Sequence, residues 1–213
     1  MRQIGILGGT FNPPHLGHIH AAVSAADELG LDRVLLIPDC LPPHKETALG
    51  SPNAEQRLEM VRLAVQDDPR LVVDDCEIRR GGKSYTFDTL TELCARFPDA
   101  KLTFICGTDM FLTLDRWYRA PELLRLARFA VAPRVEACQE ELRQKANVLQ
   151  TCFGAETVVL DTPVMELSSS EIRLRMEAGD FNGLAPKVAA YIREHGLFGV
   201  PHAVVTTCSN VSS

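Results

Sequence analysis

The chain has 213 residues, of which 46% are hydrophobic and 23% charged, and its formal net charge is −6. This composition is typical of a globular protein with a sizeable core, and the negative charge argues against nonspecific binding to duplex nucleic acid, which needs clustered Lys and Arg. No apolar run approaches the roughly 20 residues of a membrane span, and Met1 leads directly into a strand pattern, so we expect no signal segment, no membrane partner and a cytoplasmic protein.

Strand-like apolar runs alternate with helical patterns along the whole chain. The expected strands cover residues 2–7, 33–38, 71–78, 101–106, 128–132 and 156–160. The expected helices cover residues 16–29, 53–65, 86–96, 108–127 with an interruption near Pro121, 169–178 and 186–195. Because parallel strands are joined through helices that cover the sheet faces, the alternation predicts an α/β fold with a doubly wound, mostly parallel sheet and helices on both faces.

No repeat or linker divides the chain. We therefore expect a single domain over residues 1–198. The remaining residues 199–213 lose the helical period and end in small polar side chains, so a flexible tail is expected there.

The run GILGGTFNPPHLGHIHAA at residues 5–22 is the first unusual feature. Gly8 and Gly9 follow the first expected strand, and glycine at the carboxyl end of a strand lets backbone N–H groups approach a phosphate closely. The run fits neither GxGxxG nor GxxxxGK[ST]. A tight turn explains the two glycines equally well.

His15 and His18 stand three residues apart at the start of the expected helix. Residues at this spacing face the same side, so both imidazoles are expected above Gly8 and Gly9, where helix amides favour an anion. Two such histidines also suit zinc, but no third Cys, Asp or Glu ligand stands at a recognisable spacing and the seven cysteines form no CxxC pair. No metal site on the protein is therefore predicted.

Two stretches far apart in the sequence carry a resemblance. GGTFNPPHLGH at residues 8–18 resembles the GGTFDPxHxGH signature of the HxGH nucleotidylyltransferase superfamily, whose fold is Rossmann-like, and LSSSEIR at 167–173 resembles its ISSTxIR motif. Asn12 and Ser170 depart from the usual Asp and Thr but keep polar side chains. The two motifs must meet around one triphosphate.

Further stretches narrow the resemblance to the bacterial nicotinate mononucleotide adenylyltransferases (nicotinate-nucleotide adenylyltransferases). They are PPHK at 42–45, RLEM at 57–60, SYT at 84–86 before DTL, and ICGTD at 105–109 followed by WY at 117–118. The resemblance runs to about residue 198. It implies adenylyl transfer from ATP to nicotinate mononucleotide, giving deamido-NAD and pyrophosphate in NAD biosynthesis, with Mg²⁺ carried by ATP.

The same resemblance implies a role for each matching residue. The catalytic residues are His15, His18 and Arg173. The ATP-binding residues are Gly8, Gly9, Thr10, Phe11, Gly107, Asp109, Ser168, Ser169, Ser170 and Ile172. The residues that bind nicotinate mononucleotide are His44, Lys45, Tyr85, Thr86, Trp117 and Tyr118.

Each of these residues is expected to contact a particular part of a substrate. The amides of residues 8–10 hold the α-phosphate, the two histidines donate to the triphosphate, and Arg173 grips the β- and γ-phosphates. Asp109 suits the adenosine ribose, and Trp117 stacks on the pyridine ring. Amides near Thr86 bind the nicotinate carboxylate.

Three alternatives stay open at this point. The first is another enzyme of the superfamily, such as pantetheine-phosphate adenylyltransferase or a cytidylyltransferase. The second is a non-catalytic nucleotide-binding sensor, and the third, disfavoured by its ligand count, is a zinc-bound structural module. We expect small-molecule substrates and no nucleic acid, and the sequence leaves a homo-oligomer open.

Overall fold

The computed structural model of the chain describes residues 1–42, 51–133, 139–163 and 165–201. The expectations for His44 and Lys45 fall outside these ranges, as does most of the expected tail.

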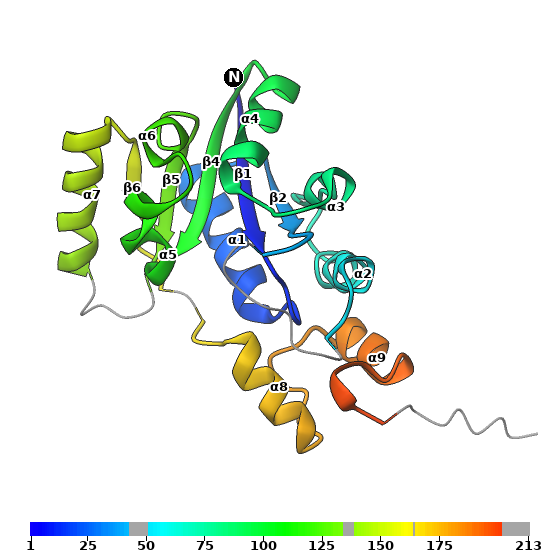
Figure 1. The fold of residues 1–213 in the computed structure, drawn as a ribbon. Helices are drawn as coiled ribbons and strands as arrows, with labels where there is room; N and C mark the ends of the chain where they lie inside the picture. The colour runs from blue at the N-terminus through cyan, green and yellow to red at the C-terminus, as the bar shows by residue number, and fades with distance from the viewer. Residues whose placement is uncertain (43–50, 134–138, 164, 202–213) are drawn as a thin grey trace, which may run out of the picture.

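Six strands form one sheet in the order β3-β2-β1-β4-β5-β6, and every neighbouring pair is parallel. The strands are β1 (Arg2–Gly9), β2 (Arg33–Pro38), β3 (Leu71–Val73), β4 (Ala100–Gly107), β5 (Arg128–Ala132) and β6 (Thr157–Val159). Figure 1 shows the arrows of β1 and β4 running side by side at the centre of the molecule. The predicted doubly wound α/β fold is confirmed.

Helices connect these strands. They are α1 (Leu16–Leu29), α2 (Ala54–Ala64), α3 (Cys76–Arg80), α4 (Thr86–Arg96), α5 (Thr108–Leu112), α6 (Ala120–Leu123), α7 (Gln139–Phe153), α8 (Ser169–Glu177) and α9 (Pro186–Glu194), with short 3₁₀ turns η1 (Leu114–Arg116) and η3 (Leu197–Gly199). None of the helices in the described ranges is long and apolar enough to cross a membrane.

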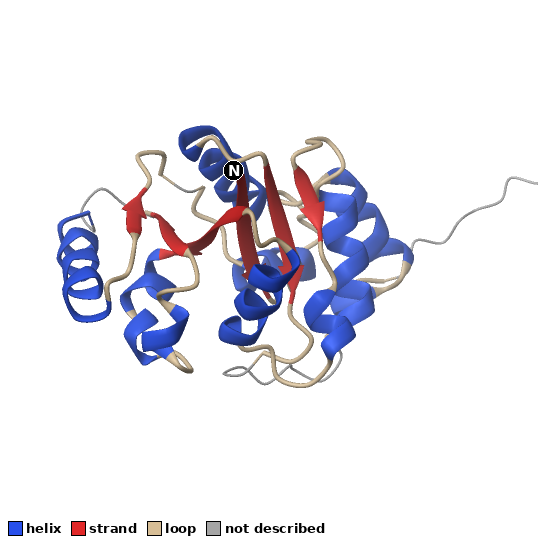
Figure 2. Ribbon diagram, turned by 90° about the horizontal axis from the view of Figure 1, so that it is seen from above, coloured by secondary structure: helices blue, strands red, loops and turns tan. Residues whose placement is uncertain are grey.

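The helices cover both faces of the sheet, as Figure 2 shows from above. On one face α1 and α2 contribute side chains such as Ala22, Ala25 and Val61 to a buried cluster with alternate residues of the strands. On the other face α4 to α7 pack through residues such as Leu93 and Phe111. Burial on both faces explains why the central strands read as continuous apolar runs.

The carboxyl-terminal helices make a separate cluster on α2. Ile172 and Met176 of α8 and Val188 and Ile192 of α9 are buried together with Met60 of α2. In Figure 1 both helices lie beyond the arrowheads of β1 and β4. This packing holds α8 at the carboxyl edge of the sheet, close to the end of β1.

Several elements differ from the sequence analysis. The helix expected over residues 108–127 is divided into α5, η1 and α6, and Pro121 lies in the first turn of α6. The strand expected over residues 71–78 ends at Val73. The Asp74 side chain accepts a hydrogen bond from the Cys76 amide (3.1 Å), and this contact starts α3. The helix α3 also includes the first residues of the loop that was expected after the strand. The first strand continues through Gly9, so the glycine pair ends β1 and does not follow it. The helix α7 was not anticipated.

Gly183 provides a test of the carboxyl-terminal packing. Its φ is +92°, and a Cβ there would lie 2.8 Å from Cδ1 of Ile172. Its carbonyl also accepts from the Leu16 amide at the start of α1 (2.8 Å). Gly179 has φ +80° but open space around its Cβ position, which makes it a matched control.

We expect Gly183→Ala to lower the free energy of unfolding by about 1–3 kcal/mol more than Gly179→Ala, because only the first adds a steric clash to the backbone strain. Urea denaturation of both variants measures the difference. Equal losses would contradict the packing described for Gly183.

Candidate active site

The sheet order reverses between β1 and β4, and in doubly wound folds ligands bind outside the carboxyl ends of the strands at such a point. Gly8 and Gly9 are the last residues of β1, and Gly107 is the last residue of β4. Gly107 is also the N-cap of α5, and nothing lies within 4 Å of the position its Cβ would take. The glycines of GGTF and of ICGTD therefore end neighbouring strands beside this crevice.

A buried arginine fixes the turn after β1. Arg57 of α2 is 3% exposed and donates through Nη1 to the Thr10 carbonyl (2.7 Å) and to Oδ1 of Asp39 (2.9 Å). Its Nη2 donates to the carbonyls of Asp39 (2.7 Å) and Cys40 (3.1 Å). Thr10 Oγ1 in turn donates to Oδ2 of Asp39 (2.7 Å). One guanidinium thus links the ends of β1 and β2.

This link was not assigned by the sequence analysis. Arg57 stands in the RLEM segment that contributed to the resemblance, and Asp39 directly follows β2, but nothing in the sequence connects the two. The one sequence signal for a buried role was that Arg57 places a positive charge on the apolar face of its helix, beside Leu58 and Val61, which are both buried.

Phe11 follows the Thr10 turn in a left-handed conformation, with φ 48°. Its ring is buried and meets the imidazole of His18 edge-on, with 4.9 Å between the ring centroids. A Cβ on Gly9 would lie 3.4 Å from the same ring. A non-glycine residue at positive φ is strained, and such strain concentrates at functional sites.

The two histidines of the motif lie against each other. His15 is the N-cap of α1, and its ring stacks on that of His18 with 3.7 Å between centroids. The backbone N–H of His15 donates to Nδ1 of His18 (3.1 Å). Burial, with a smaller contribution from His15, holds the pKa of His18 well below its usual value of 6.5.

These facts determine the protonation of His18. At neutral pH the ring is uncharged, and because Nδ1 accepts a hydrogen bond, the proton resides on Nε2. His18 is therefore a neutral donor of one hydrogen bond through Nε2–H.

The glycine of the motif lies close to two neighbours. A Cβ on Gly17 would lie 3.0 Å from Nδ1 of His15 and 3.1 Å from the Met165 carbonyl oxygen. A side chain at this position would therefore push the His15 ring or the segment that precedes α8 aside by a few tenths of an ångström.

The helix α8 contacts the turn that carries the histidines. Ser169 Oγ donates to the Pro13 carbonyl (2.9 Å), and Arg173 Nη1 donates to the Asn12 carbonyl (2.7 Å). These pairs are 156 and 161 positions apart in the sequence. The structure thus brings the two distant motifs together, as their resemblance implies.

The other residues of this motif have different environments. Ser168 caps α8, accepting from the Glu171 amide (3.2 Å), and Ser170 Oγ accepts from Nη2 of Arg173 (3.0 Å). The side chain of Ile172 is fully buried in the cluster with α2, so only its backbone can face a ligand. Arg173 uses two of the five N–H donors of a guanidinium in the contacts described.

Aromatic side chains gather at the amino end of α4. The rings of Tyr85 and Tyr118 lie 4.6 Å apart. Trp117 is half-buried and packs edge-on against Phe104 with 6.1 Å between centroids. Phe104 also lies 3.7 Å from the position of a Cβ on Gly8, so this ring connects the aromatic group to the end of β1.

The structure gives the positions of two further residues of the predicted site. Thr86 is the first residue of α4, and Asp109 is an exposed residue in the first turn of α5. Within residues 1–42, 51–133, 139–163 and 165–201, no group of three or more His, Cys, Asp or Glu is placed to hold a metal ion.

The chain is similar to known proteins over most of its length. The model of the cytidylyltransferase-like family matches residues 6–175. A Neisseria meningitidis serogroup A protein named as a nicotinate-nucleotide adenylyltransferase is 41% identical over 203 residues, covering 93% of this chain and 99% of its own. A protein of the same name from Synechococcus sp. (strain JA-3-3Ab) is 42% identical over 199 residues, covering 92% and 95%.

A solved structure shares the fold. The Plasmodium falciparum nicotinic acid mononucleotide adenylyltransferase complexed with NaAD superposes with a TM-score of 0.77 at 17% identity, covering 94% of this chain and 99% of that one.

Replacing the buried arginine should be far more costly than replacing an exposed one on the same helix. Arg57→Ala leaves Asp39, itself 7% exposed, without its buried partner, and we expect a loss of about 3–5 kcal/mol in the free energy of unfolding. Arg62 pairs with Glu59 at the surface (3.4 Å), so Arg62→Ala should cost less than about 1 kcal/mol. Similar urea midpoints for the two variants would contradict the role given to Arg57.

The lowered pKa of His18 predicts a pH dependence of stability. Below about pH 6.5 the unfolded chain protonates this residue while the native state does not, so the free energy of unfolding falls as the pH is lowered from 7, by up to about 1.4 kcal/mol per unit. His18→Asn keeps an acceptor near the Nδ1 position and removes the titration. Denaturation of both proteins between pH 7 and 5 should therefore show a shallower slope for the variant, and identical slopes would contradict the assignment.

Proposed function

The chain belongs to the cytidylyltransferase-like family, and from this we propose how its site carries out the reaction of the nicotinate-nucleotide adenylyltransferases. The protein is an enzyme that transfers the adenylyl group of ATP to nicotinate mononucleotide, giving deamido-NAD and pyrophosphate in NAD biosynthesis. Relatives of this name match over 92–93% of the chain at about 40% identity.

One observation carries the mechanism: α8 contacts the turn before α1 through Ser169 and Arg173. This contact gathers hydrogen-bond donors at the carboxyl end of β1. They are the backbone amides of the turn, Nε2–H of His18 and the unused N–H groups of Arg173. Donors converging at a helix amino end suit a polyphosphate.

In the proposed reaction a phosphate oxygen of nicotinate mononucleotide attacks the α-phosphorus of ATP. A new P–O bond forms, the bond from the α-phosphorus to the bridging oxygen breaks, and its electrons leave with pyrophosphate. The attacking phosphate is already a nucleophile, so the protein supplies orientation and charge stabilisation and no nucleophile of its own.

The proposed roles follow from the donors. The amides of Gly8, Gly9 and Thr10 hold the α-phosphate, and His18 donates to it from Nε2. Arg173 holds the β- and γ-phosphates and stabilises the charge that grows on pyrophosphate. A neutral histidine suits this role because its Nε2–H donates a hydrogen bond and is too weak an acid to transfer its proton to the phosphate.

The second substrate is assigned to the aromatic side of the crevice. Trp117 offers a flat, half-buried ring for stacking on the pyridine, and the backbone amides of the first turn of α4, next to Tyr85, suit its carboxylate. Mg²⁺ is expected to enter with ATP and to be held mainly by phosphate oxygens and water, as this ion is at phosphoryl-transfer sites.

The experiment measures pyrophosphate release from ATP and Mg²⁺ with nicotinate mononucleotide, nicotinamide mononucleotide or phosphopantetheine as the acceptor. We expect release with nicotinate mononucleotide and much slower release with the other two. If phosphopantetheine were the only acceptor that supported release, the assignment to the family would stand and the proposed substrate would be wrong.

In the same assay we expect His18→Ala to lower kcat by about 10²–10³, the typical loss of one charge-stabilising donor. Its circular dichroism spectrum should match that of the unsubstituted protein. His195→Ala removes an exposed histidine at the end of α9 and should keep normal turnover. Near-normal turnover of His18→Ala would remove the role proposed for this residue.

A further inference from the structure

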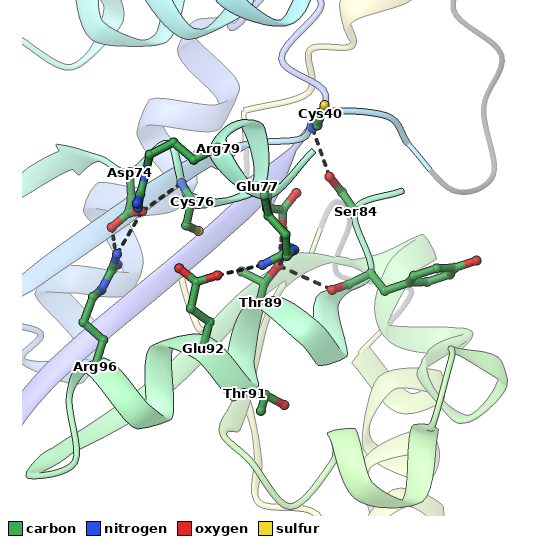
Figure 3. A network of polar contacts seen from close by, with 12 residues as sticks. Cys40, Asp74, Cys76, Glu77, Arg79, Ser84, Thr89, Thr91, Glu92 and Arg96 are labelled. Carbon is green, nitrogen blue, oxygen red and sulfur yellow. Dashed lines mark hydrogen bonds and ion pairs between the residues drawn. The ribbon is translucent and has the colours of Figure 1, made fainter. Parts of the chain in front are cut away.

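A buried carboxylate lies outside the phosphate-binding part of the site. Glu77, on the short helix α3, is 6% exposed, and nothing in the proposed reaction uses it. Figure 3 shows its side chain directed at α4, into a group of polar residues between α3 and the start of that helix. A Glu is almost never this buried unless its oxygens are satisfied.

The Thr89 hydroxyl satisfies one oxygen of the Glu77 carboxylate. Thr89 Oγ1 donates to Oε1 (2.6 Å) and itself accepts from Nη2 of Arg80 (2.8 Å). Burial raises the pKa of Glu77, and the hydroxyls of Thr89 and Ser84 act against that rise. Ser84 therefore lies beside the same carboxylate.

Ser84 is held from the opposite side as well. Its Oγ accepts from the Cys40 amide (2.9 Å), and its own amide donates to the Leu41 carbonyl (3.0 Å). Leu41 and Lys83 form a parallel bridge at the same place. Because the Ser84 oxygen accepts from Cys40, its hydroxyl proton remains available to the Glu77 carboxylate beside it.

The two hydroxyls bracket the turn that opens α4. Ser84 directly precedes Tyr85, the N-cap, and Thr86, the first helical residue. Thr89 lies one turn later, and its amide donates to the Tyr85 carbonyl (3.2 Å). A single carboxylate on α3 therefore lies between the hydroxyls on either side of Tyr85 and Thr86, the two residues assigned above to the nicotinate carboxylate.

Stability alone is a poor reason for this arrangement. Burying a carboxylate costs free energy that its hydrogen bonds only partly return, and apolar side chains of similar size often stabilise such positions better. A carboxylate that lies between two hydroxyls does, however, favour one backbone conformation of the segment that joins them.

We propose that Glu77 is a positioning residue for nicotinate mononucleotide: acting through Ser84 and Thr89, it fixes the Tyr85–Thr86 turn so that the amides of α4 meet the nicotinate carboxylate. This inference rests on the function proposed above. It assigns to Glu77 an effect on the binding of one substrate and none on ATP.

The test is steady-state kinetics of the full-length protein, with KM measured separately for each substrate. Glu77→Gln and Glu77→Ala should raise KM for nicotinate mononucleotide by about tenfold or more, the typical effect of losing hydrogen bonds to a charged group. KM for ATP should stay within about twofold. Glu92→Gln is the matched control, because Glu92 pairs with the same Arg80 (2.9 Å) from the exposed side and should leave both KM values unchanged.

Ser84→Ala tests the route by which Glu77 acts, and it remains informative if Glu77→Ala does not fold. It should raise KM for nicotinate mononucleotide as Glu77→Gln does, and the double variant should be no worse than the more severe single one, since both remove the same link. Equal rises in both KM values, an unchanged KM for nicotinate mononucleotide, or additive effects would overturn the inference.

The activity of the unsubstituted protein distinguishes failure of the proposed function from failure of the positioning role of Glu77. If it forms no deamido-NAD, the proposed function and this inference both fail. If it is active and the Glu77 variants show no selective rise in KM, only the positioning role is overturned.

Discussion

The ion pair between Arg57 and Asp39 is the interaction on which the geometry of the site depends. A buried ion pair contributes little net stability, because the cost of removing both charges from water offsets their attraction. Its value here is geometric. Arg57 binds backbone oxygens after β1 and after β2 as well as the Asp39 carboxylate, and it does so from a third element, α2. The turn that precedes the two histidines therefore cannot move independently of the strand beside it.

The polar groups around the crevice show two different ways of holding a site. On the side proposed for the phosphates, donors are left available: His18 is neutral, and Arg173 keeps N–H groups that its protein contacts do not use. On the side proposed for the pyridine, Glu77, Ser84 and Thr89 are proposed to fix the backbone beside the aromatic rings. This division suits a reaction whose nucleophile and leaving group both belong to the substrates, because the protein then contributes orientation and electrostatics.

The sequence predicted the doubly wound parallel sheet and the meeting of the two motifs, because these follow from apolar alternation and from short, specific motifs. It failed where a few side chains decide. The third strand stops early because one carboxylate, Asp74, accepts the Cys76 amide, and that hydrogen bond outweighs the apolar pattern. The helix α7 was missed because Leu142 and Leu149 are its only buried residues, which leaves a faint period. Arg57 and Glu77 act on atoms of other elements, and no local pattern encodes such contacts.

The contact between α8 and the first turn also bears on how the protein is made. Residues 169–173 leave the ribosome long after the turn at residues 12–13, and bringing segments about 160 positions apart together carries a loop-closure entropy that two hydrogen bonds do not offset. Docking depends instead on the apolar cluster that α8 and α9 share with α2. The sheet and its first turn can thus form on a nascent chain, while the site proposed for the triphosphate is completed only when the carboxyl-terminal helices have been synthesised.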